Sequence, residues 1–258
     1  MSQAKNTITI KQLVAAIAGQ LEPSQFQDYC PNGLQVQGGS EIKTLVTGVT
    51  ASQALIDAAV KHNADAVLVH HGYFWKGEDA CLTGMKYQRI KTLMDNNINL
   101  LAYHLPLDAH PVLGNNAQLA QLLGLTVEGG LQPGEARPVG NVGSLNPPMS
   151  AADFSQRVKQ VLNREPLLIG DDETMIARVA WCTGAAQGYI EQAVATGADL
   201  FLSGEISEPT VHTARELGIH YMAAGHHATE RYGVKALGEW LAAEFGLVHH
   251  FVDIDNPV

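Results

Sequence analysis

Residues 67–75 read VLVHHGYFW, a run of apolar β-forming residues that ends in two adjacent histidines and a glycine. This pattern predicts a buried strand that carries polar side chains at its C-terminal end. Side chains alternate along a strand, so His70 and His71 can serve one site only if the site lies beyond the strand end. That geometry suggests one metal ion, or two ions with one histidine each. A strand end with exposed or hydrogen-bonded histidines is the other explanation of the pair.

The sequence around this strand alternates between strand and helix patterns. Residues 44–52 predict a strand and residues 54–64 a helix with one apolar face, which makes a βαβ unit with the strand that ends at His70 and His71. A later strand, INLLAYH (98–104), is followed by His104, Asp108 and His110. The remaining predictions are helices over 9–21, 86–96, 153–163 and 228–245, a helix beginning near Asn115 or Asn116 as its cap, a connecting or edge segment over 127–150, and a terminal strand over 247–254.

An internal repeat predicts the domain organisation. A shift of 134 places residues 45–71 on residues 179–205 with eight identities in 27, among them Gln53 with Gln187 and Asp65 with Asp199. We therefore expect two copies of one βαβ-type unit. The expected segments are a first α/β repeat over 1–125, a connecting segment with a helix over 126–177, and a second repeat over 178–258.

The composition narrows the function classes. The chain has 258 residues with 46% hydrophobic content, enough for one large α/β unit or two small ones. Its net charge of -10 argues against sequence-independent binding to nucleic acid or to an anionic membrane, because both need a basic surface. No stretch has the length and apolarity of a membrane span. We expect a cytoplasmic protein.

The three cysteines give no sign of a disulfide framework or a zinc knuckle. Cys30, Cys81 and Cys182 are odd in number and far apart, without CxxC spacing. We interpret all three as small buried hydrophobic residues in a reducing compartment.

The residues with metal-ligand chemistry come from both halves of the chain. His226 and Glu230 are four residues apart at the start of a predicted helix, so they share one face and can reach one ion. With His70, His71 and Asp108 they form a set of imidazoles and carboxylates, which suits Zn, Mn, Fe or Ni. Five ligands would nearly saturate one ion, whereas two ions about 3.5–4 Å apart would keep open positions for water and substrate. We therefore expect two divalent metal ions, of Fe, Zn or Mn.

Several motifs, in this order and over nearly the whole chain, resemble the family of NGG-interacting-factor-three-like proteins, or GTP cyclohydrolase I type 2 homologues, and among them the short bacterial members. The motifs are PNGLQVQG (31–38), VHHGYFWKG (69–77), HLPLDAH (104–110) with GNN (114–116), GNVGSL (140–145), SGE (203–205) and AGHHATERYGV (224–234).

The resemblance implies that the two α/β repeats are intertwined in one structural unit, with mixed sheets and a dinuclear metal site between them. It places His70 and Asp108 on one metal and His71 and His226 on the other, with Glu230 bridging them. It also implies a toroidal homohexamer. One departure is Pro31-Asn32, which stands where the family more often has Asp-Asn, so Asn32 receives no catalytic role.

The favoured function is a dinuclear-metal-dependent hydrolase-like protein whose small-molecule substrate is a purine nucleotide or related heterocycle. Glu230 and His104 are the candidate catalytic residues; His104, His227 and Thr229 are also candidates to orient ligands or move protons. Tyr73, Phe74 and Trp75 either stack a base or pack in the core. The alternative is a non-catalytic metal-binding scaffold or regulatory interaction protein. Direct nucleic-acid binding is disfavoured by the negative charge.

Overall fold

The computed structural model describes residues 7–258 and divides them into two compact units. Unit 1 contains the chain up to Leu107 together with Val234–Asp255, and unit 2 contains Asp108–Gly233 together with Asn256–Val258. These units differ from the segments inferred from the repeat, because a repeat in the sequence need not coincide with a compact unit. Both units are mixed α/β structures, as the sequence predicts. Among the described residues, no helix has the length and apolarity that a membrane crossing needs.

Unit 1 is built on a five-stranded sheet with the order β13-β4-β5-β6-β2, in which only β2 is antiparallel to its neighbour. The first helix begins where Thr9 caps it and buries Leu13, Ile17 and Leu21 completely. The elements of unit 1 are β1 (Ile8–Thr9), α1 (Ile10–Leu21), η1 (Pro23–Gln25), β2 (Gly33–Val36), β3 (Glu41–Ile42), β4 (Thr44–Thr50), α2 (Gln53–Lys61), β5 (Ala66–His71), α3 (Gly84–Asp95), β6 (Asn99–Ala102) and β13 (Val248–Phe251).

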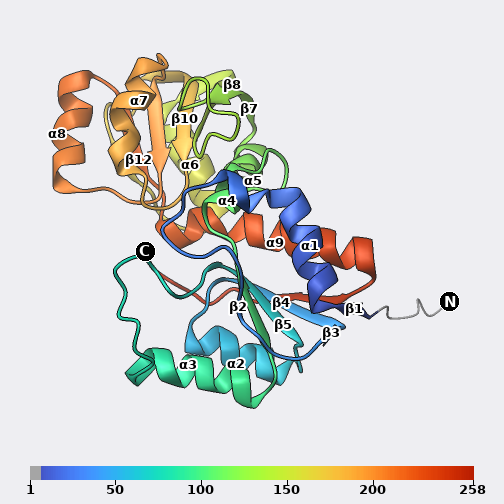
Figure 1. Ribbon diagram of the computed structural model, residues 1–258. Helices are drawn as coiled ribbons and strands as arrows, with labels where there is room; N and C mark the ends of the chain where they lie inside the picture. The colour runs from blue at the N-terminus through green and yellow to red at the C-terminus, as the bar shows by residue number, and fades with distance from the viewer. Residues whose placement is uncertain (1–6) are drawn as a thin grey trace. The chain divides into compact units, whose positions relative to one another are not determined.

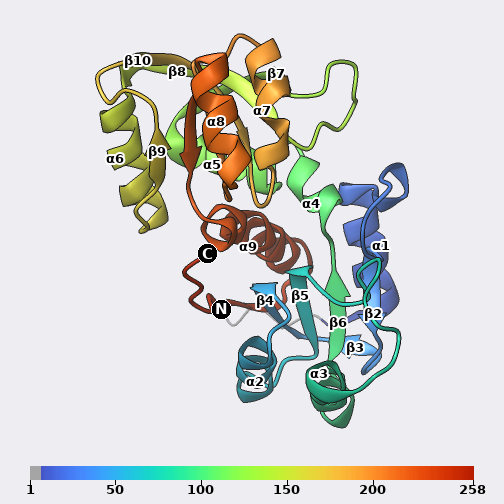
Figure 2. The same cartoon turned by 90° about the vertical axis from the view of Figure 1, so that its left-hand side faces the viewer.

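Helices cover both faces of this sheet. Figures 1 and 2 show α2 and α3 on one face, and α1 with the C-terminal part of α9 (His226–Phe245) on the other. Val67 and Val69 of β5 belong to the hydrophobic cluster under α2 and α3, so Leu68 and His70, which alternate with them, point to the opposite face. The two-sided cover explains why residues 67–69 are all apolar.

Unit 2 is built on a six-stranded mixed sheet with the order β7-β8-β10-β11-β12-β9. Its three central strands, β10, β11 and β12, are parallel to one another. The elements of unit 2 are α5 (Asn115–Leu123), β7 (Leu125–Gly130), β8 (Asn141–Ser150), α6 (Ala151–Leu162), β9 (Leu167–Ile169), β10 (Met175–Cys182), η2 (Gln187–Tyr189), α7 (Ile190–Ala195), β11 (Leu200–Ser203), α8 (Glu208–Leu217) and β12 (His220–Ala223); the short helix α4 (Leu105–Ala109) and α9 each cross the boundary between the units.

The segment 127–150 is more regular than the sequence suggests. We expected a connecting or edge segment, and β7 is indeed an edge strand, but β8 lies inside the sheet between β7 and β10. The glycine content reflects close backbone packing, because a Cβ atom on Gly143 would lie 1.9 Å from the carbonyl oxygen of Thr126.

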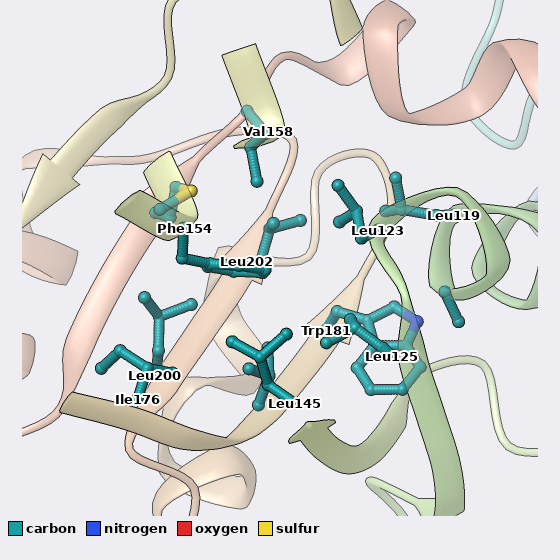
Figure 3. Packing of buried hydrophobic residues seen from close by; sticks show 14 of the residues in the cluster. Leu119, Leu123, Leu125, Leu145, Phe154, Val158, Ile176, Trp181, Leu200 and Leu202 are labelled. Atoms are coloured by element: carbon teal, nitrogen blue, oxygen red, sulfur yellow. The ribbon is translucent and has the colours of Figure 1, made fainter. Parts of the chain in front are cut away.

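The core of unit 2 follows from strand alternation. Val179 and Trp181 of β10 face α5 and α6, whereas Ala180 and Cys182 face α7 and α8. Trp181 is completely buried, and Figure 3 shows it among leucines of α5, β7, β8 and β11. Its indole N–H donates to the carbonyl oxygen of Asn116 at 3.0 Å, which fixes the start of α5 against β10.

The structure corrects the expectation for one cysteine. Cys30 and Cys182 are buried as predicted, but Cys81 is exposed. It lies in the loop before α3, where its backbone N–H donates to Asp79 at 2.9 Å. An apolar pattern cannot report burial in a loop that lacks regular structure.

Candidate metal centre

In unit 1 the ends of two neighbouring parallel strands bring three histidines together. His70 and His71 end β5, and His104 follows β6 after Tyr103. One ring nitrogen from each can be chosen so that all three lie within 4.8 Å of one another. The ring centroids are 4.5 Å apart for His70 and His71, 5.0 Å for His70 and His104, and 5.8 Å for His71 and His104. We call these three residues the imidazole cluster.

The Nδ1 atom of each of these histidines has a hydrogen-bond partner within unit 1. His70 Nδ1 lies 3.0 Å from the carbonyl oxygen of Tyr103, and His104 Nδ1 lies 2.7 Å from Asp28 Oδ1. Because a carbonyl and a carboxylate can only accept, both Nδ1 atoms carry a proton and donate it in these contacts, which leaves the Nε2 atom of each ring as its possible metal-binding atom. His71 Nδ1 lies 3.2 Å from the hydroxyl of Thr50.

The sequence predictions missed Asp28, which is the most highly hydrogen-bonded carboxylate beside the cluster. Besides His104, it accepts from the N–H of Tyr29 at 2.6 Å, the side-chain amide of Asn32 at 2.8 Å and the N–H of Leu105 at 2.9 Å. Burial raises the pKa of Asp28, but the hydrogen bonds and the charge of His104 outweigh burial, and the net pKa is lowered.

Asn32 also has a defined structural role. Its side-chain oxygen accepts the backbone N–H of His104 at 2.7 Å, while its amide donates to Asp28. It therefore holds both members of the Asp28–His104 pair. The motif PNG indicated only a turn, because a contact between residues 72 positions apart leaves no local signal.

In unit 2 the first turn of α9 holds the second group. His226 Nε2 and Glu230 Oε2 are 3.1 Å apart, four residues along the helix, as the sequence predicts. His226 Nδ1 contacts Glu205 Oε1 at 2.7 Å. Burial lowers the pKa of His226, but the hydrogen bonds and charges of Glu230 and Glu205 more than offset it and raise the pKa to about 9. The carboxylates therefore favour positive charge at this position.

Asp108 completes this group. Its carboxylate and that of Glu230 have oxygens within 4.8 Å of each other. Asp108 Oδ1 accepts from the amide of Asn115 at 2.8 Å and from the hydroxyl of Thr183 at 3.2 Å. We call Asp108, His226 and Glu230 the unit 2 ligand set.

Asn115 and Asn116 do not cap α5, so that prediction is wrong. The N-cap is Gly114, which has no side chain that could cap the helix. Asn115 instead holds Asp108 and accepts the N–H of Gly233 at 2.9 Å, and Asn116 accepts the N–H of Thr183 at 3.1 Å. Both side chains are buried and fix the surroundings of Asp108.

Two glycines make room for the unit 2 ligand set. A Cβ atom on Gly184 would lie 2.1 Å from Glu230 Oε1, and the residue has a φ of 70°. A Cβ atom on Gly204 would lie 2.7 Å from the Cα atom of His226. Both glycines follow the C-terminal ends of parallel strands, the edge at which α/β sheets place their sites.

The other candidate residues support the backbone or the core. Thr229 Oγ1 accepts the N–H of Gly184 at 3.1 Å and donates within the first turn of α9. His227 is buried, and its N–H bonds to the carbonyl oxygen of Val258. Tyr73 is buried and its hydroxyl donates to Ala51, as the core interpretation predicts.

Trp75 differs from its neighbours Tyr73 and Phe74. Its ring lies 5.0 Å from that of His104 and 5.9 Å from that of His71. The indole therefore forms a wall of the imidazole cluster, whereas the Phe74 side chain is exposed.

The donor atoms of both groups fit a divalent cation of borderline hardness. Metal-bound histidines usually donate their second ring N–H to a carboxylate or a backbone carbonyl, and His70, His104 and His226 all have such a partner. Cys30 forms another set with Asp28 and His104, in which one possible ligand atom of each residue lies within 4.8 Å of the others. Burial raises the pKa of the Cys182 thiol, and the charges of Asp108 and Glu230 raise it further, which shows the negative field of the unit 2 ligand set.

Comparisons with known proteins agree over nearly the full length. A family model described as Duf34/NIF3 (NGG1p interacting factor 3) matches residues 8–257. A curated protein from Pseudomonas aeruginosa, named GTP cyclohydrolase 1 type 2 homolog, is 58% identical and covers 97% of this chain and 99% of its own. A Vibrio cholerae protein of the same name is 57% identical, covering 96% of this chain and 98% of its own.

Solved structures show the same fold. The structural-genomics protein ybgI, described as of unknown function, has a TM-score of 0.92 at 50% identity and covers 97% of this chain and 100% of its own. TTHA1606 from Thermus thermophilus has a TM-score of 0.87 at 32% identity, with the same coverage.

Proposed function

The chain belongs to the Duf34/NIF3 family, and from this premise we propose that it is a metal-dependent hydrolase-like protein acting on a purine nucleotide or a related heterocycle. The observation that carries the proposal is the pair of histidine-containing groups, both at the C-terminal ends of parallel strands and both with their imidazoles held by outer hydrogen bonds. Such outer partners orient a ring for a ligand and raise its basicity.

The residues that would hold two divalent ions are His70, His71, Asp108, His226 and Glu230. When bound, divalent cations supply Lewis-acid activation of water and of an electrophilic carbon or phosphorus centre. His104 immediately precedes α4, and Asp108 lies within this short helix, four residues further along the chain. Glu230 is almost completely buried, which suits a ligand more than a surface charge.

The chain's own residues would prepare this site before any substrate arrives. Asn115 and Thr183 hold one carboxylate oxygen of Asp108, and Glu205 holds the outer nitrogen of His226. Trp75 supplies an aromatic face beside the imidazole cluster, where a heterocyclic base could pack against it.

A turnover screen with a matched pair of variants tests the proposal. Protein loaded with Mn²⁺, Fe²⁺ or Zn²⁺ is expected to hydrolyse at least one compound from a panel of GTP, other purine nucleotides and related heterocycles. Glu230→Gln removes the charge and is expected to reduce turnover about 10–100-fold, the usual effect of losing a group that supports a metal site. Glu239→Gln, on an exposed position of the same helix, is the control.

Two results would contradict the proposal. Equal turnover in the Glu230→Gln and Glu239→Gln variants would remove Glu230 from the reaction. Absence of turnover over the whole panel, with partner proteins captured only in the metal-loaded state, would instead support a non-catalytic scaffold.

We also propose that the two units contain the two copies of one duplicated βαβ-type unit. Asp65 Oδ2 accepts the N–H groups of residues 43 and 44 at 2.8 and 2.9 Å, and Asp199 Oδ2 accepts those of residues 177 and 178 at 2.9 and 2.8 Å. These are equivalent positions under the shift of 134. Asp65 and Asp199 therefore have the same structural role in each unit, which supports the duplication. This role is structural and not catalytic.

A toroidal homohexamer is the assembly we propose. Five large apolar side chains on or just before α3 are exposed in unit 1, and a contact between subunits would bury them: Phe74, Leu82, Met85, Tyr87 and Met94. Sedimentation equilibrium at micromolar protein tests the assembly, since a mass of one or two chains would contradict it.

A further inference from the structure

The geometry points to a second site in unit 2, a pocket that binds the phosphate group of a small organic phosphate. The pocket has a volume of about 480 Å³ and is lined by the end of α4, the start of α5, the strands β7 and β8 and the loop between these two strands. None of the five proposed metal ligands is among the described residues that line it. The inference rests on the proposed function only in the choice of purine nucleotides as probes.

Two motifs of the sequence meet in this pocket. His110 is the last residue of HLPLDAH, and Asn141 is the second residue of GNVGSL. His110 Nδ1 accepts the N–H groups of Val112 at 3.2 Å and Leu113 at 2.9 Å, which fixes the ring against the turn that follows α4. Neither His110 nor Asn141 belongs to the imidazole cluster or to the unit 2 ligand set, so the pocket gives both motif residues a role that the metal centre does not.

Asn116 holds the pocket against the segment that carries Asp108. Its side-chain amide donates to the backbone carbonyl of Asp108 at 3.3 Å and to that of Val139, the residue after Pro138 in the wall of the pocket. Ala109, the next residue after Asp108, lines the pocket directly. A molecule bound here therefore lies beside the backbone of Asp108, a member of the unit 2 ligand set.

The walls of the pocket suit the organic part of such a ligand. Ala117, Val127 and Pro138 contribute aliphatic surface. Gly130 lets Pro138 approach β7 closely, because a Cβ atom on Gly130 would lie 2.3 Å from the Pro138 ring. Small-molecule sites usually combine apolar walls with a few polar groups and have volumes of about 300–1,000 Å³. A free phosphate ion would leave most of this pocket empty, which favours an organic phosphate over the free ion.

Arg137 supplies the charge that a phosphate needs. It lines the pocket, and its guanidinium stays protonated and carries five N–H donors in a fork that matches phosphate oxygens. A bidentate partner uses only two of these donors, so a phosphate can bind beside any contact that Arg137 already makes. Glu128 also lines the pocket, but Arg178 donates to it, and this bond lowers the pKa of the Glu128 carboxyl. The negative charge of Glu128 is therefore balanced by a cation and opposes an anion only weakly.

Titration calorimetry of the full chain with GMP, AMP and guanosine tests the inference. Native protein, metal-loaded or chelator-treated, is expected to bind the nucleotides about 10–100-fold more tightly than guanosine, the range for hydrogen bonds to a charged group. Arg137→Gln is expected to remove this difference by weakening nucleotide binding, while guanosine binding stays unchanged. Arg215→Gln, at an exposed position of α8, is the charge-matched control.

A variant that fills the pocket tests the inference independently. Ala117→Leu keeps a good helix former on α5 and places a larger side chain in the lining, so it is expected to weaken GMP binding by about 10-fold or more. Gln121→Leu, at an exposed position one turn later, adds the same side chain outside the lining and is the control. Circular dichroism establishes that each variant is folded, and Ala117→Leu decides the question if Arg137→Gln does not fold.

The inference and the proposed function fail in different ways. Unchanged GMP affinity in Arg137→Gln would overturn the inference, as would nucleotide binding that is lost on chelation and independent of Arg137, or no nucleotide binding at all. Turnover with an unchanged KM in Arg137→Gln would overturn the inference and leave the proposed function standing. GMP binding that depends on Arg137, in a protein without turnover, would uphold the inference while the proposed hydrolase fails.

Discussion

Single side chains decide whether the unit 2 ligand set exists. Asn115 is fully buried and uses both ends of its amide, donating to Asp108 and accepting from Gly233. It thus connects the start of α5 to both Asp108 and the middle of α9. A leucine of similar volume would leave the N–H of Gly233 without this acceptor, at a cost of about 1–3 kcal/mol.

Gly184 gives a prediction at the same scale. Gly184→Ala is expected to lower the free energy of unfolding by about 1–2 kcal/mol from its positive φ alone. The added Cβ atom also pushes against Glu230 Oε1, so metal content measured by elemental analysis is expected to fall by at least half.

Gly188 provides the control for this substitution. It lies in the following short helix, is exposed, and has no atom within 4 Å of an added Cβ. Gly188→Ala is expected to change neither metal content nor the urea midpoint by a measurable amount. Equal metal content in the two variants would show that Glu230 is not a ligand.

Among the elements, the terminal strand β13 has a titratable anchor. His249 lies in β13, and its Nε2 is 2.8 Å from the hydroxyl of Thr47 on β4. Burial, together with repulsion from His250 and Lys235, lowers the pKa of His249 to about 4. The ring also fills the space that a Cβ atom on Gly238 of α9 would take, 2.3 Å from Nε2.

This anchor predicts a pH dependence of stability. The unfolded chain binds a proton at His249 near pH 6.5, whereas the folded chain does so only near pH 4, so stability is lost as the pH falls from about 6.5 to 4. The lowered pKa of His250, mainly from burial, adds a loss of the same sign.

Urea unfolding at several pH values measures this effect. His249→Gln keeps an amide group near the position of Nε2 and cannot take up the proton, so its stability is expected to fall less steeply between pH 6.5 and 4. A slope equal to that of the native protein would show that other groups cause the acid sensitivity.

At the scale of the whole molecule, metal binding and folding are expected to be coupled. Ions that bind only the folded chain stabilise it by about 2.7 kcal/mol when present at 100 times their dissociation constant. For units of this size that corresponds to a rise in Tm of about 5–10 °C over chelator-treated protein.

Differential scanning calorimetry with and without Zn²⁺ or Mn²⁺ measures this coupling. The His70→Ala, Glu230→Ala double variant is expected to show a much smaller rise in Tm. An equal rise in the double variant and in native protein would assign the stabilisation to ions bound elsewhere.

Local patterns were sufficient for most of the elements. The helix α1 and the strand β5 were predictable because their apolar residues follow the period of one regular structure, and the αβ alternation fixed the class. The ligand-type residues at strand ends were also visible, since strand direction places their side chains at one edge. The limits of the two compact units could not be predicted from local patterns, because contacts between distant segments decide them.

The sequence by itself determined the strand and helix pattern, the internal repeat, and the residue types able to bind a metal, since each of these depends on spacing along the chain. Only the tertiary structure revealed that Asp28 accepts a hydrogen bond from His104 and that Asn115 donates one to Asp108. It also revealed that the lack of a side chain at Gly184 leaves room for Glu230. These partners are 76, 7 and 46 positions apart, and hydrogen bonds and steric contacts between such residues depend on how the sheets and helices pack. No periodicity in the chain records that packing.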